Sequence, residues 1–226
     1  MKTAFESGIR YSDCGCIIRI NRISVWPGPK FMGIMNMSHV DAGIMRRDSH
    51  DQHKLCHRAA ERLFLSDGTK DISFRMDALR KLKSAIKAHE QDILDALKQD
   101  LNKSAFEAYA TELGIVYAEL DDAIRHLPKW AGKKRVRTPI MHFKSSSYRV
   151  PEPYGVVLIM SPWNYPFQLA FAPLIGAMAA GNCAVVKPSS YSPHTSSLIA
   201  KILGGCFPEE YIAVIEGGRE ANQELL

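Results

Sequence analysis

Residues 154–188 constrain the fold of this 226-residue chain more than any other segment. They contain two short apolar runs, 155–160 and 183–186, which are rich in Val, Ile and Leu, as is typical of strands buried on both faces. An alanine-rich stretch of helical length, about 167–180, lies between these runs and stops at Gly181, a residue type that often ends helices. A strand–helix–strand unit with such short connections requires parallel strands and a right-handed crossover.

Two loops follow the carboxyl ends of these predicted strands. The first, 161–166, reads Ser-Pro-Trp-Asn-Tyr-Pro, and the second begins at Lys187. Because ligands bind at the carboxyl ends of strands in open parallel sheets, we predict a binding edge here. Asn164 offers a neutral N–H donor that could stabilise an oxyanion at this edge. The alternative is that Asn164 only caps the following helix or satisfies backbone groups of the loop.

Composition excludes several classes of protein. Hydrophobic content of 46% and charged content of 23% are typical of a globular protein, and a net charge of +5 gives no indication of nucleic acid as a partner. The five cysteines lack regular spacing, which argues against a disulfide framework and favours a reducing compartment, so we expect a cytoplasmic protein. No apolar run reaches the ~18–20 residues of a membrane span, and residues 1–13 do not resemble a secretory signal.

Residues 1–58 show no clear hydrophobic period. We predict that they form a disordered or weakly ordered extension before a domain that covers residues 59–226. The histidines and cysteine near the end of this extension could suggest a metal site, but their spacing matches no standard zinc pattern, and we predict no metal site. These residues are His39, His50, His53, Cys56 and His57.

Helical periodicity dominates the next part of the chain. Apolar residues recur at helical spacing from Ile72 to Leu97, which predicts one amphipathic helix. The segment 104–107 has the form of a capping box and predicts the start of a second helix, which Pro128 ends or kinks. We expect the two helices to pack antiparallel to each other on the sheet.

The basic run 133–137 allows two interpretations, a patch that binds phosphate or nucleic acid and a solvated connector. The connector is favoured because no aromatic platform or base-reading motif accompanies the run. Loose alternation over 141–150 predicts an exposed antiparallel hairpin. The last predicted elements are a helix from Pro193 to Gly204, a third parallel strand over 211–215 and the start of a helix over 220–226.

Four motifs in order give the sequence a resemblance to the aldehyde dehydrogenase superfamily, and within it to the class 3-like branch. The resemblance runs from about Gly68 to the C-terminus. It implies an α/β fold, the N-terminal part of a dinucleotide-binding domain, with an incomplete doubly wound parallel sheet and helices on both faces. It also implies NAD(P)-dependent oxidation of an aldehyde to a carboxylic acid. The motifs are residues 153–156, 162–166, 179–182 and 187–189.

The resemblance assigns roles to individual residues. It implies that Asn164 supplies an oxyanion-hole amide and that Lys187 binds the ribose hydroxyls of NAD or NADP. Ser190 stands where most members carry a glutamate beside the ribose, which leaves the preference between NAD and NADP open and predicts weakened binding. Gly217 and Gly218 would allow close approach of the adenine, or they form an ordinary turn. The other cofactor-binding residues that the resemblance implies are Met160, Ser161 and Trp163.

The positions of the cysteines bear on whether these 226 residues can oxidise an aldehyde by themselves. In this family a thiolate attacks the aldehyde, and by resemblance that cysteine and the general-base glutamate come after Leu226. Cys183 is predicted to be a core residue and Cys206 to lie in a turn. We therefore expect no aldehyde oxidation by this chain alone.

Three alternatives remain open at this stage. The chain could be a non-catalytic truncated paralogue that associates, as a homo- or heterodimer, with a full-length partner. It could be the first part of a longer reading frame. A related acyl reductase such as a semialdehyde dehydrogenase fits less well, because the Trp163-Asn164 pair is more typical of class 3.

Overall fold

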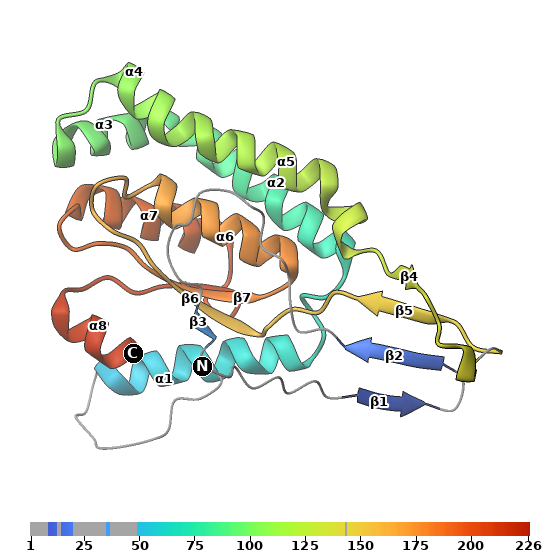
Figure 1. The fold of residues 1–226 in the computed structure, drawn as a ribbon. Helices are drawn as coiled ribbons and strands as arrows, with labels where there is room; N and C mark the ends of the chain where they lie inside the picture. Colours follow the sequence, from blue (N-terminus) through green and yellow to red (C-terminus); the bar gives the residue numbers. More distant parts are fainter. Residues whose placement is uncertain (1–8, 13–14, 20–34, 37–48, 143) are drawn as a thin grey trace, which may run out of the picture.

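The computed structural model describes residues 9–12, 15–19, 35–36, 49–142 and 144–226. Figure 1 shows these residues as a stack of layers with a small sheet extending from one end. An outer pair of long helices covers two shorter helices, which cover a parallel sheet, and two further helices lie on the opposite face. The binding edge predicted from the sequence belongs to the parallel sheet at the centre of the stack.

The central sheet has the order β3-β6-β7-β8. Strands β6 (Val156–Met160), β7 (Cys183–Lys187) and β8 (Ile212–Val214) run parallel, and the short β3 (Met35–Asn36) pairs antiparallel with β6. All five residues of β7 are buried, as the continuous apolar pattern predicts for a strand covered on both faces. The three parallel strands predicted from the sequence are thus confirmed.

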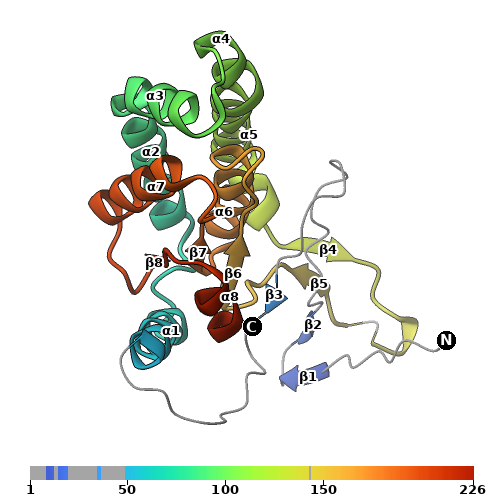
Figure 2. The ribbon, with the colours of Figure 1, turned by 90° about the vertical axis from the view of Figure 1, so that its left-hand side faces the viewer.

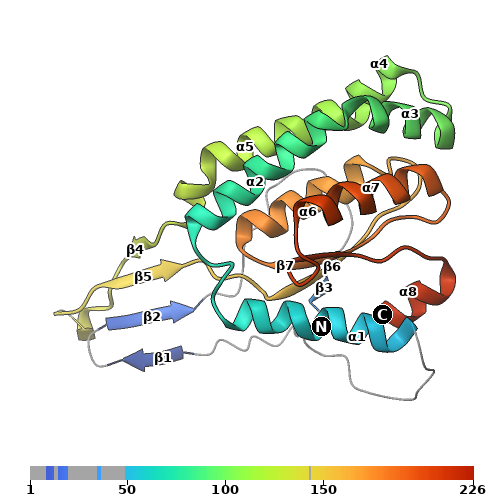
Figure 3. The ribbon, with the colours of Figure 1, turned by 180° about the vertical axis from the view of Figure 1, so that it is seen from behind.

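Helices cover both faces of this sheet, which confirms the incomplete doubly wound fold. Helices α6 (Gln168–Ala180) and α7 (Pro193–Cys206) lie on one face. Figure 3 shows α1 (Ser49–Leu65) and α8 (Arg219–Leu225) on the other. The boundary predicted at residues 58 and 59 falls inside α1, and the division into extension and domain stays a prediction.

Two details of α6 and α7 bear on the predicted helix ends. Helix α6 stops as expected, because Gly181 adopts the left-handed conformation with φ 89°. The predicted end of α7 at Gly204 is wrong, since the helix continues through both glycines to Cys206. The buried side chains of Cys206 and Phe207 anchor this last turn in the core, so packing outweighs the low helix propensity of glycine.

The predicted single helix from Ile72 to Leu97 is also wrong. It is two helices, α2 (Ile72–Ala88) and α3 (Glu90–Leu101), separated at His89 by a non-helical backbone. The apolar stripe continues across the break because α2 packs on α5, α6 and α7 while α3 turns to pack on α7. Both helices therefore bury apolar faces, and the sequence periodicity does not reveal the change of direction.

The predicted second helix begins as expected, because the Ser104 hydroxyl accepts a hydrogen bond from the Glu107 N–H at 3.2 Å. It then consists of α4 (Ala105–Ala108), a π-helical turn η1 (Tyr109–Leu113) and α5 (Gly114–Ala131). Pro128 does not end it, since α5 continues for three residues beyond. This helix and α2 pack on α6 rather than directly on the sheet, which corrects the predicted arrangement.

A second sheet projects from the stack, in the order β1-β2-β5-β4. The hairpin predicted over 141–150 has different bounds, because its first strand is β4 (Lys134–Val136). The basic run interpreted as a connector therefore contributes this strand. β4 pairs antiparallel with β5 (Ser147–Val150), and the short helix η2 (Ile140–His142) lies between them. β2 (Gly15–Arg19) pairs parallel with β5, and β1 (Ile9–Ser12) pairs antiparallel with β2.

The described residues contain neither a membrane-spanning helix nor a cluster of metal ligands. None of their helices combines the length and apolar character needed to cross a membrane. None of their His, Cys, Asp and Glu side chains form a group of three suited to a metal ion. His39 and the side chains of His50, His53 and Cys56 lie outside the described residues, so the prediction of no metal site there is not tested.

Candidate functional site

Three loops meet at the carboxyl edge of the central sheet. The strand register places Met160 beside Lys187. The Ser161 N–H donates to the Lys187 carbonyl oxygen at 3.1 Å, and the Ile215 N–H donates to the Val186 carbonyl oxygen at 2.9 Å. The loops after β6, β7 and β8 are therefore neighbours, as parallel strands require.

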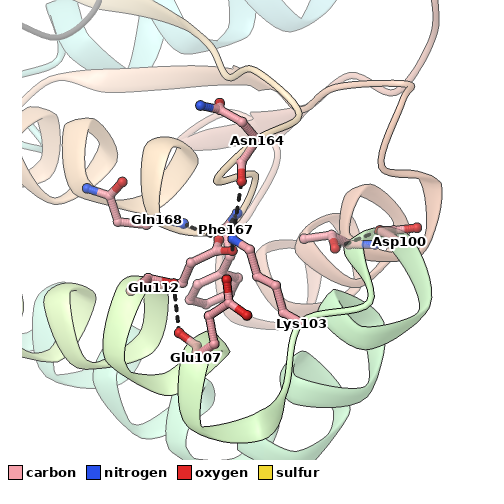
Figure 4. Close-up of polar contacts among 9 residues, drawn as sticks. Asp100, Lys103, Glu107, Glu112, Asn164, Phe167 and Gln168 are labelled. Atoms are coloured by element: carbon pink, nitrogen blue, oxygen red, sulfur yellow. Dashed lines mark hydrogen bonds and ion pairs between the residues drawn. The ribbon is translucent and has the colours of Figure 1, made fainter.

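Asn164 lies in the loop after β6 and is exposed. Figure 4 shows its carboxamide pointing away from the outer helices, whereas its backbone carbonyl oxygen faces Lys103. Within the described part of the chain, the carboxamide makes no hydrogen bond, and the backbone oxygen accepts one from the Lys103 ammonium at 3.1 Å. Asn164 does not cap α6, and its side-chain N–H donors have no partner among the described residues, which leaves them able to meet a ligand.

The cap of α6 comes from Glu112, which the sequence analysis missed. One carboxylate oxygen, Oε2, accepts the N–H groups of Phe167 at 2.9 Å and Gln168 at 3.2 Å. The other, Oε1, accepts from the Lys103 ammonium at 2.6 Å. Glu112 is completely buried, so this carboxylate compensates the positive end of α6 in surroundings of low dielectric constant.

Lys103 links this carboxylate to the loop that carries Asn164. Its ammonium lies 4.1 Å from the centre of the Tyr165 ring, in addition to its bonds to Glu112 and to the Asn164 carbonyl. Lys103 is 8% exposed, which means that the ion pair is shielded from water. A cation held over an aromatic face in such surroundings adds a further attractive contact.

Buried or partly buried charges also hold the C-terminal end of α6 and the N-terminal end of α7. The Arg75 guanidinium donates to the carbonyl oxygens of Thr69 at 3.0 Å and of Ala179, in the last turn of α6, at 3.3 Å. Asp100 accepts the N–H groups of His194 at 3.1 Å and Thr195 at 2.7 Å, in the first turn of α7. Arg75 and Asp100 lie 94 to 104 positions from these helix ends in the sequence, so no local pattern indicates the contacts.

Lys187 ends β7 and is 3% exposed. Its ammonium donates to the carbonyl oxygens of Pro188 at 2.9 Å and Gly217 at 2.5 Å, which ties the loop after β7 to the loop after β8. Burial lowers the pKa of this ammonium below its usual value. A lysine ammonium has three N–H donors, so the contacts within the described residues leave one of them for a ligand hydroxyl.

The other predicted cofactor-binding residues lie along the same edge. Met160 and Ser161 are the last residue of β6 and the first of its loop, and the buried Ser161 hydroxyl has no partner among the described residues. Trp163, Ser190 and Gly218 are exposed in the three loops. A Cβ at Gly218 would meet no atom within 4 Å, so the backbone there is open to close approach. Their assigned roles stay predictions.

The two cysteines whose surroundings are described are unsuited to act as nucleophiles. Cys183 is fully buried at the start of β7, and burial raises the pKa of its thiol to about 12. Cys206 is 8% exposed in the last turn of α7 rather than in a turn as predicted, and burial also raises the pKa of its thiol. A nucleophilic cysteine needs the opposite shift, toward the thiolate.

Comparison with known protein families decides the relationship. The model of the aldehyde dehydrogenase family matches residues 38–226, most of the chain. This chain belongs to the aldehyde dehydrogenase family. The match begins upstream of Gly68, where the resemblance noted in the sequence began, and it includes α1.

Curated relatives place the chain near class 3 members. It is 50% identical over 163 residues to the 4,4'-diaponeurosporen-aldehyde dehydrogenase of Staphylococcus aureus, which is 72% of this chain and 36% of that protein. It is 40% identical over 169 residues to aldehyde dehydrogenase family 3 member A2 of Pongo abelii, which is 75% of this chain and 35% of that protein. The chain thus spans about a third of the length of these relatives.

Solved structures agree with this placement. The substrate-bound structure of Staphylococcus aureus AldH superimposes with a TM-score of 0.75 at 47% identity, covering 76% of this chain and 38% of that one. The glyceraldehyde-3-phosphate dehydrogenase GapN of Methanocaldococcus jannaschii, solved with NADP, superimposes with a TM-score of 0.67 at 22% identity, covering 80% of this chain and 40% of that one. The second comparison supports the fold alone.

Proposed function

We propose that this chain supplies the oxyanion donor and part of the nucleotide-binding edge of an NAD(P)-dependent aldehyde dehydrogenase, which oxidises an aldehyde to a carboxylic acid. The observation that carries the proposal is the position of Asn164. Its carboxamide, which has no hydrogen-bond partner among the described residues, lies at the same sheet edge as Lys187 and the glycine turn after β8. Family membership supports the class of reaction.

The chemistry of this edge follows from the groups present. When a thiolate adds to an aldehyde, negative charge develops on the former carbonyl oxygen, and the Asn164 N–H can donate to it. The nicotinamide, when bound, takes up the hydride that leaves the substrate carbon. Lys187, the orphaned Ser161 hydroxyl and the open Gly218 backbone fit a ligand with ribose hydroxyls and a flat base.

In this proposal neither Cys183 nor Cys206 is the nucleophile, because both thiols are buried and have raised pKa values.

The decisive test of the proposal is a chimera. The aligned 163 residues of this chain would replace the matching segment of the Staphylococcus aureus relative, which retains its own remaining residues. Aldehyde-dependent NADH formation by the chimera supports the proposal, whereas a folded chimera that binds nucleotide but forms no NADH contradicts it. The 226-residue chain alone is expected to form none above the blank.

Replacing Lys187 with methionine tests the nucleotide edge of the intact chain. The substitution retains the stem but removes the donors, so we expect NAD and NADP affinity to fall at least tenfold, the equivalent of about 1.4 kcal/mol for one hydrogen bond to a charged group. Isothermal titration calorimetry of the 226-residue chain would measure the affinity for NAD and for NADP. Lys201→Met, on the exposed side of α7, is the matched control and should leave affinity unchanged.

A second proposal is that the chain associates with a full-length family member, as a homo- or heterodimer partner. It is favoured by the apolar side chains Ile140 and Met141, which are 88% and 85% exposed in η2, between the two strands of the hairpin. Size-exclusion chromatography of a mixture with the Staphylococcus aureus relative would test it. Co-elution that is lost in Ile140→Ser would support association, and separate elution would contradict it.

Because the two buried thiols are free and the sequence offers no disulfide framework, we also propose a reducing, cytoplasmic location.

A further inference from the structure

We propose that Glu112, acting through Lys103, is the positioning residue for Asn164. The inference deepens the proposed function and rests on it for the role of the Asn164 carboxamide. It concerns how a loop without regular structure keeps that carboxamide in one place. Neither residue carries a signal in the local sequence. Lys103 lies in the connection between α3 and α4, and Glu112 lies in η1, so neither belongs to the sheet.

The loop needs such support because its own backbone bonds lie only at its ends. The Ser161 N–H bonds to Lys187 at the start, and the Tyr165 carbonyl oxygen accepts from the Leu169 N–H at 3.0 Å at the other end. Between these points, among the described residues, the hydrogen bond to the backbone is the one from Lys103 to the Asn164 carbonyl oxygen. Rotation of the peptide group after Asn164 is limited by this contact.

Glu112 fixes both sides of Asn164 with one carboxylate. Through Oε1 it holds the Lys103 ammonium, which binds the Asn164 carbonyl and covers the Tyr165 ring. Through Oε2 it holds the first turn of α6 directly after the loop. Bidentate use of one buried carboxylate therefore couples the position of the loop to that of the helix that follows it.

The π-helical turn η1 explains how Glu112 reaches this place. Glu112 lies within the turn Tyr109–Leu113, between α4 and α5. One residue rotates the side-chain direction by about 100° in a helix of 3.6 residues per turn, so the wider turn changes which residue faces α6. π-helical turns are rare and often occur at functional sites, in agreement with a positioning role.

Asp100 allows a positioning role of Glu112 to be distinguished from a role in stability alone. Asp100 caps α7 as Glu112 caps α6, with a partly buried carboxylate that accepts two backbone N–H groups. It does not contact the loop that carries Asn164 in any contact of the described residues. If Glu112 only stabilised a helix, the two carboxylates would be equivalent with respect to Asn164.

The test uses the ¹⁵N-labelled 226-residue chain, with the Asn164 carboxamide signal assigned by its loss in Asn164→Asp. In Glu112→Gln we expect this signal to shift and broaden. In the double variant Lys103→Met with Glu112→Gln, the new amide oxygen still accepts from Phe167 and Gln168, so their N–H signals stay near their original positions while the Asn164 carboxamide signal moves. Asp100→Asn should leave the Asn164 signal unchanged.

An unchanged Asn164 signal in the folded double variant would overturn the inference, as would an equal change in Asp100→Asn. The chimera separates this outcome from a failure of the proposed function. In the chimera, the double variant should lower kcat by about 10²-fold and leave KM unchanged. A displacement of the Asn164 carboxamide by about 1 Å is enough for a loss of this size. If Asn164→Ala leaves kcat unchanged, the proposed function fails while the NMR result stands. If Asn164→Ala lowers kcat and the double variant does not, the positioning role fails.

Discussion

Asn164→Ala in the chimera is expected to lower kcat for aldehyde oxidation by about 10²–10³-fold, or about 3–4 kcal/mol of transition-state stabilisation. The alanine removes the N–H donor that we propose stabilises the developing oxyanion, while the backbone contact with Lys103 can persist. Since the interaction forms mainly in the transition state, KM for the aldehyde should change little. Steady-state kinetics at saturating NAD would measure both constants.

The control for this experiment is Gln99→Ala, which removes an exposed carboxamide on α3, outside the site. It should leave kcat within about twofold, because surface substitutions of this kind rarely matter. An Asn164→Ala chimera with the kcat of the parent would show that the carboxamide does not stabilise the oxyanion. The proposed role of this sheet edge would then be limited to nucleotide binding.

Lys103→Met should lower the free energy of unfolding by about 3–5 kcal/mol, because it leaves the Glu112 carboxylate buried without its cation. The carboxylate is fully buried, so water cannot replace the lost ammonium. Urea denaturation of the 226-residue chain, followed by far-UV circular dichroism, would measure the change. Adding Glu112→Gln should recover part of the loss, since the neutral amide needs no counter-charge.

The exposed pair Lys83–Asp121 provides the matched control. Its nitrogen and oxygen lie 2.5 Å apart, but the side chains are 37% and 52% exposed. Lys83→Met should therefore lower the free energy of unfolding by less than about 1 kcal/mol. Equal losses in the two variants would contradict the view that burial makes the Lys103–Glu112 pair important.

The central strand–helix–strand unit could be predicted because each part depends on neighbours in the sequence. Continuous apolar runs indicate buried strands, and Gly181 ends α6 in the left-handed conformation that glycine adopts with least strain. The same reasoning failed at His89, where the apolar stripe continues through a change of direction. The expectation that α5 could end at Pro128 was also wrong, because the buried Leu127 and the partly buried Ala131 pack against the core and carry the helix past the missing N–H.

The candidate site was predicted in part for a similar reason. A loop that follows a parallel strand must lie at the ligand-binding edge, so Asn164 and Lys187 could be placed from the chain order alone. The hydrogen bond from Lys187 to the Gly217 carbonyl oxygen could not be predicted from the chain order, because it depends on the spacing of two neighbouring strands. The position of the Asn164 carboxamide likewise depends on groups outside its loop.

The amino-acid sequence by itself determined the parallel strands, the crossover helices and the edge at which a ligand can bind, because hydrophobic pattern and turn residues act locally. The tertiary structure alone decided that Glu112, Arg75 and Asp100 would hold the ends of those helices. These partners are separated by 55 to 104 positions along the chain. A carboxylate finds its partner among distant N–H groups only when packing removes both from water, and no local pattern records that event.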